Sequence, residues 1–302
     1  MFKPKRNKLM IQAIKKVQRN QTADFKYSLL IPTWNNLEYI KFCVASIRKN
    51  SFFTHQIVII INEGKDGTLA WVESQPDLDY VYSPINLGIC YGLNSCRSLI
   101  QTNYVVYLND DMYLLPNWDK ALEEEIVAIG HNNFILSGTM IEPTDTGNPC
   151  VVVKNYGNSL ENFQEALLLS EFETLAKDNW TGSTWPPIIL PTDLWDLVGG
   201  MSIEFSPGMY SDPDLSMKLW MAGVRIFKGI GKSKVYHFGS KSTRRVKKNK
   251  GSDTFLMKWG MTSGSFVNGY LKRGAKYMEA LPEPEIGLLF KWKNKLKRIK
   301  RC

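Results

Sequence analysis

The sequence has few of the features that mark disulfide-rich, metal-cluster or membrane-spanning proteins. Its 302 residues include only five cysteines, which form neither an even-numbered disulfide framework nor the spacing of a metal site. We therefore expect reduced thiols in a cytosolic compartment. No apolar segment follows the basic N-terminus, and no run approaches 18 consecutive apolar residues. We accordingly expect neither a signal peptide nor a membrane span.

Acidic residues are absent from three basic segments of the chain. Residues 1–19, 241–250 and 291–301 carry 20 of the 38 Lys and Arg residues and none of the 29 Asp and Glu residues. The formal net charge of +9 therefore comes from these segments, and the rest of the chain is acidic. Since the segments lack a motif of interleaved aromatic residues, we expect no nucleic-acid partner.

Apolar residues recur at helical spacing near both ends of the chain. Met10, Ala13, Ile14 and Val17 predict a short basic amphipathic helix in an N-terminal extension, residues 1–26, for which a solvated tail is the alternative. The last residues mix Leu, Phe, Trp and Ile with cations, which predicts an interfacial helix in a basic C-terminal tail, residues 251–302. Both ends would suit an anionic membrane surface, where each cation contributes about 1 kcal/mol.

Strands and helices alternate in the acidic body of the chain. Apolar, β-rich runs separated by amphipathic helical segments predict an α/β fold with a Rossmann-like, mostly parallel central sheet flanked by helices. In such sheets a ligand binds beyond the carboxyl ends of the strands. These ends carry Pro32 and Thr33, then Glu63, then residues 86–88, then residues 109–111. We expect all of them to line one crevice.

The buried strand predicted at residues 104–108 stops at Asn109, Asp110 and Asp111. Two adjacent carboxylates at the mouth of a buried strand repel each other unless a cation or several donors lie beside them. Mg²⁺ and Mn²⁺ prefer oxygen ligands and commonly take only one or two protein carboxylates. The turn therefore predicts a divalent metal site, and the alternative is an ordinary polar turn, where Asn and Asp are also favoured.

Three features of the second half are candidates for function. One stretch is rich in Gly, Pro and Trp and contains Trp180 and Trp185. It predicts a mobile lid or an acceptor pocket, and the alternative is an ordinary loop held in place by buried aromatic side chains. Asp212 precedes a helix that should end before Gly223, so it is either a helix cap or a functional acid. His237 ends a predicted strand and is either a ligand or a satisfied structural residue.

Six stretches resemble, in order and spacing, the inverting family 2 glycosyltransferases, whose nucleotide-sugar domain has the GT-A fold. They are LLIPTWNN (29–36), NEGKDGT (62–68), NLGICYGLN (86–94), YVVYLNDDMYLLPNW (104–118), LVGGMSIEFSPGMYSDPDLSMKLWMAGVRI (197–226) and VYHFGSKS (235–242). The resemblance implies a GT-A domain over residues 27–250. Its nucleotide-sugar half would cover about residues 27–118 and its acceptor half about residues 119–250.

The resemblance implies a hexosyltransferase that moves a sugar from a nucleotide-diphosphate donor to a glycan or lipid-linked acceptor with inversion. Asp111 and His237 would bind Mg²⁺ or Mn²⁺, and Asp212 would be the catalytic base, with Asp214 as the alternative. The implied nucleotide-sugar site consists of Pro32, Thr33, Asn35, Glu63, Asn86, Gly88, Asn109 and Asp110. The implied acceptor site consists of Trp180, Trp185, Gly200 and Asp214.

The resemblance and the basic ends together imply a cytoplasmic enzyme that is peripheral at the inner face of the plasma membrane and serves cell-surface polysaccharide or lipopolysaccharide synthesis. One alternative is a non-catalytic carbohydrate- or membrane-binding module on the same fold. Another is a sugar-phosphate nucleotidyltransferase, but such enzymes typically have a Gly-rich basic loop where this chain has PTWNN. The sequence departs from the family at Asn62 and Glu63, where two aspartates are frequent, and at Ser211, where a glutamate is frequent.

Overall fold

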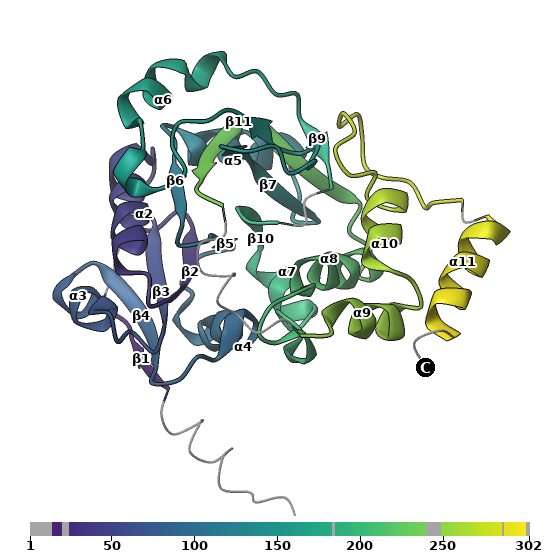
Figure 1. Ribbon diagram of the computed structural model, residues 1–302, viewed down its shortest axis with the longest axis horizontal. Helices are drawn as coiled ribbons and strands as arrows, with labels where there is room; N and C mark the ends of the chain where they lie inside the picture. Colours follow the sequence, from purple (N-terminus) through teal and green to yellow (C-terminus); the bar gives the residue numbers. More distant parts are fainter. Residues whose placement is uncertain (1–13, 20–23, 183–184, 240–248, 286, 300–302) are drawn as a thin grey trace, which may run out of the picture.

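A computed structural model describes residues 14–19, 24–182, 185–239, 249–285 and 287–299. One central sheet with helices on both faces organises the molecule and runs through both predicted halves (Figure 1). The strands are β1 (Lys15–Val17), β2 (Ser28–Trp34), β3 (Gln56–Asn62), β4 (Leu78–Ser83), β5 (Tyr104–Tyr107), β6 (Met112–Leu114), β7 (Phe134–Glu142), β8 (Val152–Val153), β9 (Trp180–Thr181), β10 (Ile188–Pro191) and β11 (Ile226–His237).

The strand order is β1-β4-β3-β2-β5-β10-β7-β11-β6, with β8 beside β7 and β9 beside β11. The pairs β4-β3, β3-β2 and β2-β5 are parallel, as predicted for the first half of the chain. Beyond β5 the sheet is mixed, because β10 runs antiparallel to both β5 and β7. The α/β fold with a helix-flanked central sheet is thus confirmed. The parallel part of the sheet consists of β2, β3, β4 and β5, whose carboxyl ends were expected to line the crevice.

Helices cover both faces of the sheet. They are α2 (Leu37–Asn50), α3 (Thr68–Ser74), α4 (Gly88–Ser95), α5 (Trp118–Ile129), α6 (Glu165–Glu171), α7 (Thr192–Leu197), α8 (Ser211–Met221), α9 (Gly251–Trp259), α10 (Ser263–Gly269) and α11 (Leu288–Ile299). Within the described residues, none of these helices combines the length and the apolar character that crossing a membrane requires.

The core has one layer on each side of the sheet. Leu29 and Ile31 of β2 pack with α2, α3 and α5, whereas Leu30 packs with α4, α7 and α8 on the opposite face. Because successive side chains of a strand point to opposite faces, a strand covered on both sides must be apolar at every position. This explains the uninterrupted run Ile57–Ile61 in β3, all of which is buried.

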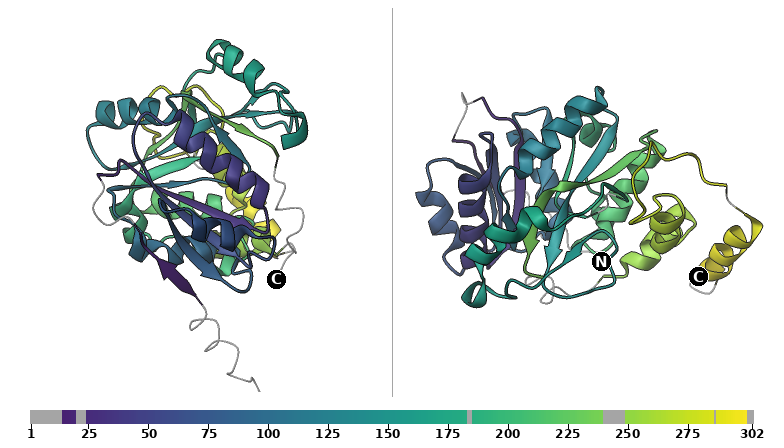
Figure 2. Two further views of the ribbon diagram at one scale, coloured as in Figure 1. Left: turned by 90° about the vertical axis from the view of Figure 1, so that its left-hand side faces the viewer. Right: turned by 90° about the horizontal axis from the view of Figure 1, so that it is seen from above.

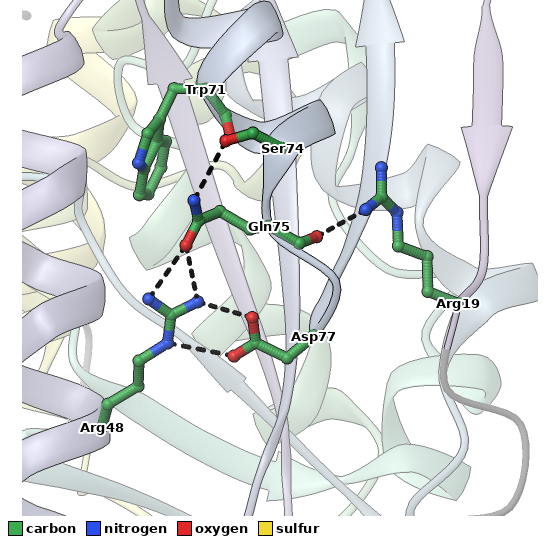
Figure 3. A network of polar contacts seen from close by, with 6 residues as sticks. All are labelled: Arg19, Arg48, Trp71, Ser74, Gln75 and Asp77. Carbon is green, nitrogen blue, oxygen red and sulfur yellow. Dashed lines mark hydrogen bonds and ion pairs between the residues drawn. The ribbon is translucent and has the colours of Figure 1, made fainter.

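The N-terminal extension differs from the predicted amphipathic helix. Met10 and Ala13 lie outside the described residues, but Val17 belongs to β1, which pairs antiparallel with the outer edge of β4. Arg19, just beyond β1, donates to the backbone carbonyl of Glu73. It also donates to the backbone carbonyl of Gln75, whose side chain accepts from Arg48 of α2 (Figure 3). A helix of one or two turns is barely stable in water by itself. The unpaired N–H and C=O groups on the edge of β4 stabilise this segment as an added strand instead.

Irregular positions divide or limit the elements in the second half of the chain. The strand predicted to end at His237 is the long strand β11, which has an irregularity between Ile230 and Lys234. α6 is a short helix with a 3₁₀ turn on either side, Leu160–Asn162 and Phe172–Thr174. α9 and α10 are separate helices, because Gly260 ends α9 in the left-handed conformation (φ 70°) and the Thr262 side chain caps the start of α10.

Candidate active site

A cavity of about 790 Å³ lies beyond the carboxyl ends of β2, β3 and β5. The structure brings ten of the predicted site residues to its wall, so the ends of β2 and β5 and the loop after β4 share one crevice, whereas Glu63, which was also expected there, does not line it. The ten residues are Pro32, Thr33, Asn86, Gly88, Asn109, Asp110, Asp111, Trp185, Asp212 and His237.

Hydrogen bonds between neighbouring strand ends fix the first part of the wall. The Thr33 hydroxyl donates to Asp110 Oδ2 at 2.8 Å, which ties the end of β2 to the acidic turn after β5. Asn62, at the end of β3, accepts from the backbone N–H of Leu87 at 2.8 Å. Asn86 in turn accepts from the backbone N–H of Gly88 at 2.8 Å. Asn62, where the family often has an aspartate, thus holds the loop that begins α4.

Gly88 occupies a position that only glycine fits. Its backbone is left-handed (φ 73°), and a Cβ atom there would lie 2.7 Å from Pro207 Cα. The next residue, Ile89, donates its backbone N–H to the Pro207 carbonyl at 2.7 Å. Two loops far apart in the sequence therefore meet at this point and close the cavity between the two halves of the chain.

Asp111, His237 and Glu142 form a buried acid–histidine–acid row on the opposite side of the acidic turn. His237 Nε2 lies 3.4 Å from Asp111 Oδ1, and His237 Nδ1 lies 3.0 Å from Glu142 Oε1. Burial by itself would lower the pKa of His237, but the two carboxylates outweigh it and raise the pKa to about 10. The backbone supports the row, because β11 pairs with β6 through His237 and Met112, directly after Asp111.

The carboxylate oxygens of this row suit a hard divalent ion, and His237 would join them as a ligand once the ion displaces a proton from its ring. His237 Nε2 is buried and has no hydrogen-bond partner among the described residues, and Glu142 fixes the ring through the other nitrogen. Metal-binding histidines commonly have such a carboxylate on their second nitrogen. The described residues contain no group of three or more His, Cys, Asp or Glu side chains that could surround a metal. Asp111 and His237 would therefore supply two ligands, and water and phosphate oxygens the others.

Asp212 lies at the cavity wall in the first turn of α8. The helix begins at Ser211, after Tyr210 in the left-handed conformation, so Asp212 is not the helix cap that the sequence allowed. Its Oδ1 atom is buried and has no hydrogen-bond partner among the described residues. Burial raises the pKa of Asp212 to about 7. A carboxylate with this pKa is suited to accept a proton near neutral pH.

Asp214, the alternative base, is placed differently. It is fully buried behind the wall, where Trp259 Nε1 donates to Asp214 Oδ1 at 2.8 Å and Lys258 Nζ lies 2.9 Å from the same oxygen. These contacts bind α8 to α9 and leave Asp214 outside the cavity lining. Between the two acids left open by the sequence, only Asp212 faces the cavity.

Four other predicted site residues also lie outside the lining. Asn35 donates to Glu63 Oε2 at 3.3 Å, and the two residues connect the loops that follow β2 and β3. Trp180 is buried in the sheet, where its Nε1 donates to the Thr139 hydroxyl at 2.9 Å. Gly200 has a left-handed backbone (φ 60°), and a Cβ atom there would lie 2.4 Å from Asn94 Oδ1. The structure therefore does not bring Trp180 or Gly200 to an acceptor pocket.

The cavity also contains residues that the sequence analysis did not single out. Glu142 ends β7, so the rule that ligands bind beyond strand ends would have found it had the strand been predicted to its full length. Tyr107, Asn148, Asn268 and Arg273 also line the cavity. Arg273 lies in an irregular loop after α10, and no periodicity or motif marks it in the sequence.

Comparisons with known proteins agree with this architecture. Residues 28–169 match the family model described as glycosyl transferase family 2. The structure is similar to S. aureus TarS 1–349 in complex with UDP-GlcNAc, with 14% identity and a TM-score of 0.54 over 92% of this chain and 72% of that chain. It is also similar to GalNAc-T7 with UDP, GalNAc and Mn²⁺, with 14% identity and a TM-score of 0.55 over 91% of this chain and 54% of that chain. A sequence search of the curated proteins found no match.

Proposed function

Since residues 28–169 of this chain belong to glycosyl transferase family 2, we propose that it transfers one sugar, a hexose unit, from a nucleotide-diphosphate donor to an acceptor hydroxyl with inversion of configuration. The chain is a glycosyltransferase of the GT-A type, and its donor is a nucleotide sugar. One observation carries the finer proposal: the Asp212 carboxylate, with a pKa of about 7, lies on the same cavity as the Asp111–His237 pair.

The proposed reaction is a single displacement. The acceptor oxygen forms a bond to the anomeric carbon while the bond from that carbon to the diphosphate oxygen breaks. The hydroxyl proton passes to Asp212, and the bonding electron pair leaves with the nucleoside diphosphate. Attack from the face opposite the leaving group inverts the anomeric configuration. General-base assistance of this kind contributes roughly 10²- to 10⁴-fold to the rate.

Asp111 and His237 would hold Mg²⁺ or Mn²⁺ beside the diphosphate. Such an ion, when bound, neutralises the negative charge that develops on the leaving group. Glu142 keeps His237 Nδ1 engaged, so that Nε2 faces Asp111. Thr33 holds Asp110 beside the donor. Pro32, Asn86, Gly88 and Asn109 form the rest of the proposed nucleotide-sugar pocket.

We place the enzyme in the cytoplasm, peripheral at the inner face of the plasma membrane, where it would extend a glycan or lipid-linked acceptor for a cell-surface polysaccharide or lipopolysaccharide. The geometry of α11 supports this location. Leu288, Trp292, Leu296 and Ile299 are all exposed, Trp292 at 64%, and fall within about 80° of one helix face. Asn294, on the other side of the helix, is buried and accepts from the backbone N–H of Thr262.

The body thus contacts α11 through Asn294 and leaves the apolar stripe exposed. The helix itself lies at the outer end of the molecule, beyond α9 and α10 (Figure 2). Exposed cations at Lys293, Lys295, Lys297 and Arg298 accompany the stripe. An apolar face flanked by cations binds the headgroup region of an anionic lipid layer.

Calorimetric titration tests the donor site. We expect one of UDP, dTDP and GDP to bind in the presence of Mn²⁺, and Asp111→Asn to lose the metal-dependent part of that affinity. The matched variant Asp212→Asn should bind the nucleotide like the wild type but lose transfer. A product of retained anomeric configuration would refute the single displacement. Absence of binding by any nucleotide, in protein with a normal melting curve, would refute the transferase proposal.

Vesicle flotation tests the location. We expect the full chain to bind vesicles with 30% phosphatidylserine or phosphatidylglycerol and not phosphatidylcholine vesicles, and the double variant Trp292→Ser, Leu296→Ser to remain unbound. The control pair Phe52→Ser, Val127→Ser removes two exposed apolar residues of the body and should leave flotation unchanged. Equal flotation of the α11 variant and the wild type would refute the role of the helix.

A further inference from the structure

The cavity wall beyond the acidic turn carries a cation without an acidic partner. Arg273 is the only Arg or Lys among the described residues that line the cavity, whereas Asp110, Asp111, Glu142 and Asp212 are acidic. Arg273 Nε is buried and has no hydrogen-bond partner in the described part of the chain. No described carboxylate lies within ion-pair distance of its guanidinium. A partly buried guanidinium in this state is costly unless a ligand supplies an anion.

The fold holds this cation in a fixed place. The loop around Arg273 is bonded to β9 on both sides, because the Thr181 hydroxyl donates to the Lys272 carbonyl at 2.6 Å and the Gly274 N–H donates to the Thr181 carbonyl at 2.9 Å. Arg273 also donates its backbone N–H to Val267 of α10 at 3.0 Å. The loop also packs closely against Gly182, the residue after β9. A Cβ atom on Gly182 would lie only 2.9 Å from Arg273 Cα, so there is no room for the loop to move in that direction.

An aromatic ring supports the guanidinium. Arg273 Cζ lies 5.4 Å from the centroid of the Trp185 ring, which also lines the cavity. The backbone of Trp185 is itself held, because its carbonyl accepts from the Ser137 hydroxyl at 3.1 Å. Stacking on an indole orients a guanidinium and leaves its in-plane N–H groups free to bind both oxygens of a carboxylate or phosphate.

The sheet places this pair away from the proposed nucleotide pocket. Tyr107 of β5 pairs with Ile188 of β10, Ile188 pairs with Ser137 of β7, and Ser137 pairs with Gly229 of β11. Gly229 pairs in turn with Trp180 of β9, which lies next to the Arg273 loop. Arg273 is therefore level with the end of β5 but lies on the side opposite β2, β3 and β4, whose ends form the nucleotide pocket. Pro32, Thr33 and Asn86 of the proposed nucleotide pocket therefore lie across β5 from Arg273, and the pocket and the Arg273–Trp185 pair occupy different parts of the cavity wall.

We propose that Arg273 and Trp185 form a subsite that binds an anionic group, a phosphate or a carboxylate, on the acceptor. The subsite rests on the proposed transferase function and specifies its substrate class: the acceptor is an acidic glycan or a phosphate-bearing chain rather than a neutral sugar. Trp185 covers an apolar sugar or polyol face, and the guanidinium binds the adjacent anion. The hydroxyl that attacks then lies between this subsite and Asp212.

Paired probes test the subsite. Glycerol 3-phosphate is compared with glycerol, and glucuronate with glucose, by calorimetry on the protein saturated with its nucleotide and Mn²⁺. We expect the anionic member of each pair to bind about 10- to 100-fold more tightly, the range that a charge-assisted hydrogen bond supplies. Arg273→Gln should abolish the difference, and Arg273→Lys should restore part of it. Lys276→Gln, in the same loop but paired with Asp178 on the surface, should behave like the wild type.

A second pair of probes separates the acceptor from the donor. UDP-glucuronate and UDP-glucose, or the same sugars on whichever base binds, are titrated into the wild type and Arg273→Gln. We expect equal affinities in both proteins. If only the glucuronate donor loses affinity in the variant, Arg273 binds the donor sugar and the acceptor assignment is refuted. If every nucleotide loses affinity, Arg273 belongs to the diphosphate site and the assignment is refuted as well.

The two proposals fail in different ways. A protein that binds no nucleotide refutes the transferase function, and the phosphate and carboxylate probes can still be titrated into it. A protein that binds nucleotide but does not distinguish anionic from neutral probes refutes the subsite alone. Normal nucleotide affinity and an unchanged melting curve in Arg273→Gln establish that a lost preference does not come from misfolding.

Discussion

Replacing Asp212 by asparagine should make the protein more stable above neutral pH while removing most of its transfer activity. Asn has the shape of Asp but no ionisation. The pKa of Asp212 is about 7 in the folded protein, against an ordinary value of 3.8, because burial disfavours the charged carboxylate. The folded state therefore retains a proton that the unfolded chain has already released between about pH 4 and pH 7. In that interval the wild type loses stability as the pH rises.

The size of the effect follows from this difference in pKa. It corresponds to at most about 4 kcal/mol above pH 7, and we expect about 1–4 kcal/mol because the side chain is only partly buried. Asp212→Asn lacks this loss, so it should match the wild type near pH 4 and exceed it at pH 8. All other titrating groups are common to the two proteins and cancel in the comparison. In a chain of this length, each kcal/mol raises the melting temperature by roughly 2–4 °C.

Two assays check the prediction on the same samples. Thermal or urea unfolding between pH 4 and pH 8 should give two curves that diverge as the pH rises, with the variant above the wild type. Transfer should fall by roughly 10²- to 10⁴-fold in the variant. In the wild type, kcat/KM should rise with pH through about 7, since the base must be deprotonated. A variant that is less stable than the wild type at pH 8, or a difference that does not change with pH, would refute the argument.

Three further outcomes follow from single contacts. Gly88→Ala should lower the free energy of unfolding by about 1–3 kcal/mol and weaken nucleotide binding, because φ is 73° and the new Cβ meets Pro207; urea unfolding and calorimetry check both effects. Glu142→Gln should weaken Mn²⁺ affinity about 10- to 100-fold at constant fold, because it loosens the orientation of His237, and titration of Mn²⁺ with nucleotide present measures this. Deleting residues 1–19 should expose the edge of β4 and promote self-association, which light scattering detects; a deletion that stays monomeric would contradict the edge-covering role of β1.

The first half of the fold could be predicted from the sequence because local pattern and global topology agree there. β2, β3 and β5 are continuous apolar runs, each ends on polar residues, and parallel strands bring those ends together. β10 offers no comparable signal, since the short run Ile188–Pro191 between Pro187 and α7 carries no indication of strand direction. β1 was mistaken for a helix because its pairing partner, the edge of β4, is distant in sequence.

The same contrast decides which site residues could be found. Thr33, Asp110 and Asp111 follow predicted strands, so their place in the cavity follows from the fold class alone. Arg273 reaches the cavity through three backbone or hydroxyl bonds between its loop, β9 and α10, and each of these bonds joins segments that sequence periodicity does not relate.

Asp212 and Asp214 show where the pattern of a single helix stops being informative. Two residues apart in an α-helix lie about 200° apart around its axis, so one of the two acids had to face away from the cavity. The sequence could not say which one, because the answer depends on where α9 packs. In the structure α9 places Trp259 and Lys258 against Asp214, and both contact its Oδ1 atom. Asp212 on the opposite side lines the cavity, and burial raises its pKa to about 7. The packing that gives Asp214 a structural role therefore also leaves Asp212 available as the base.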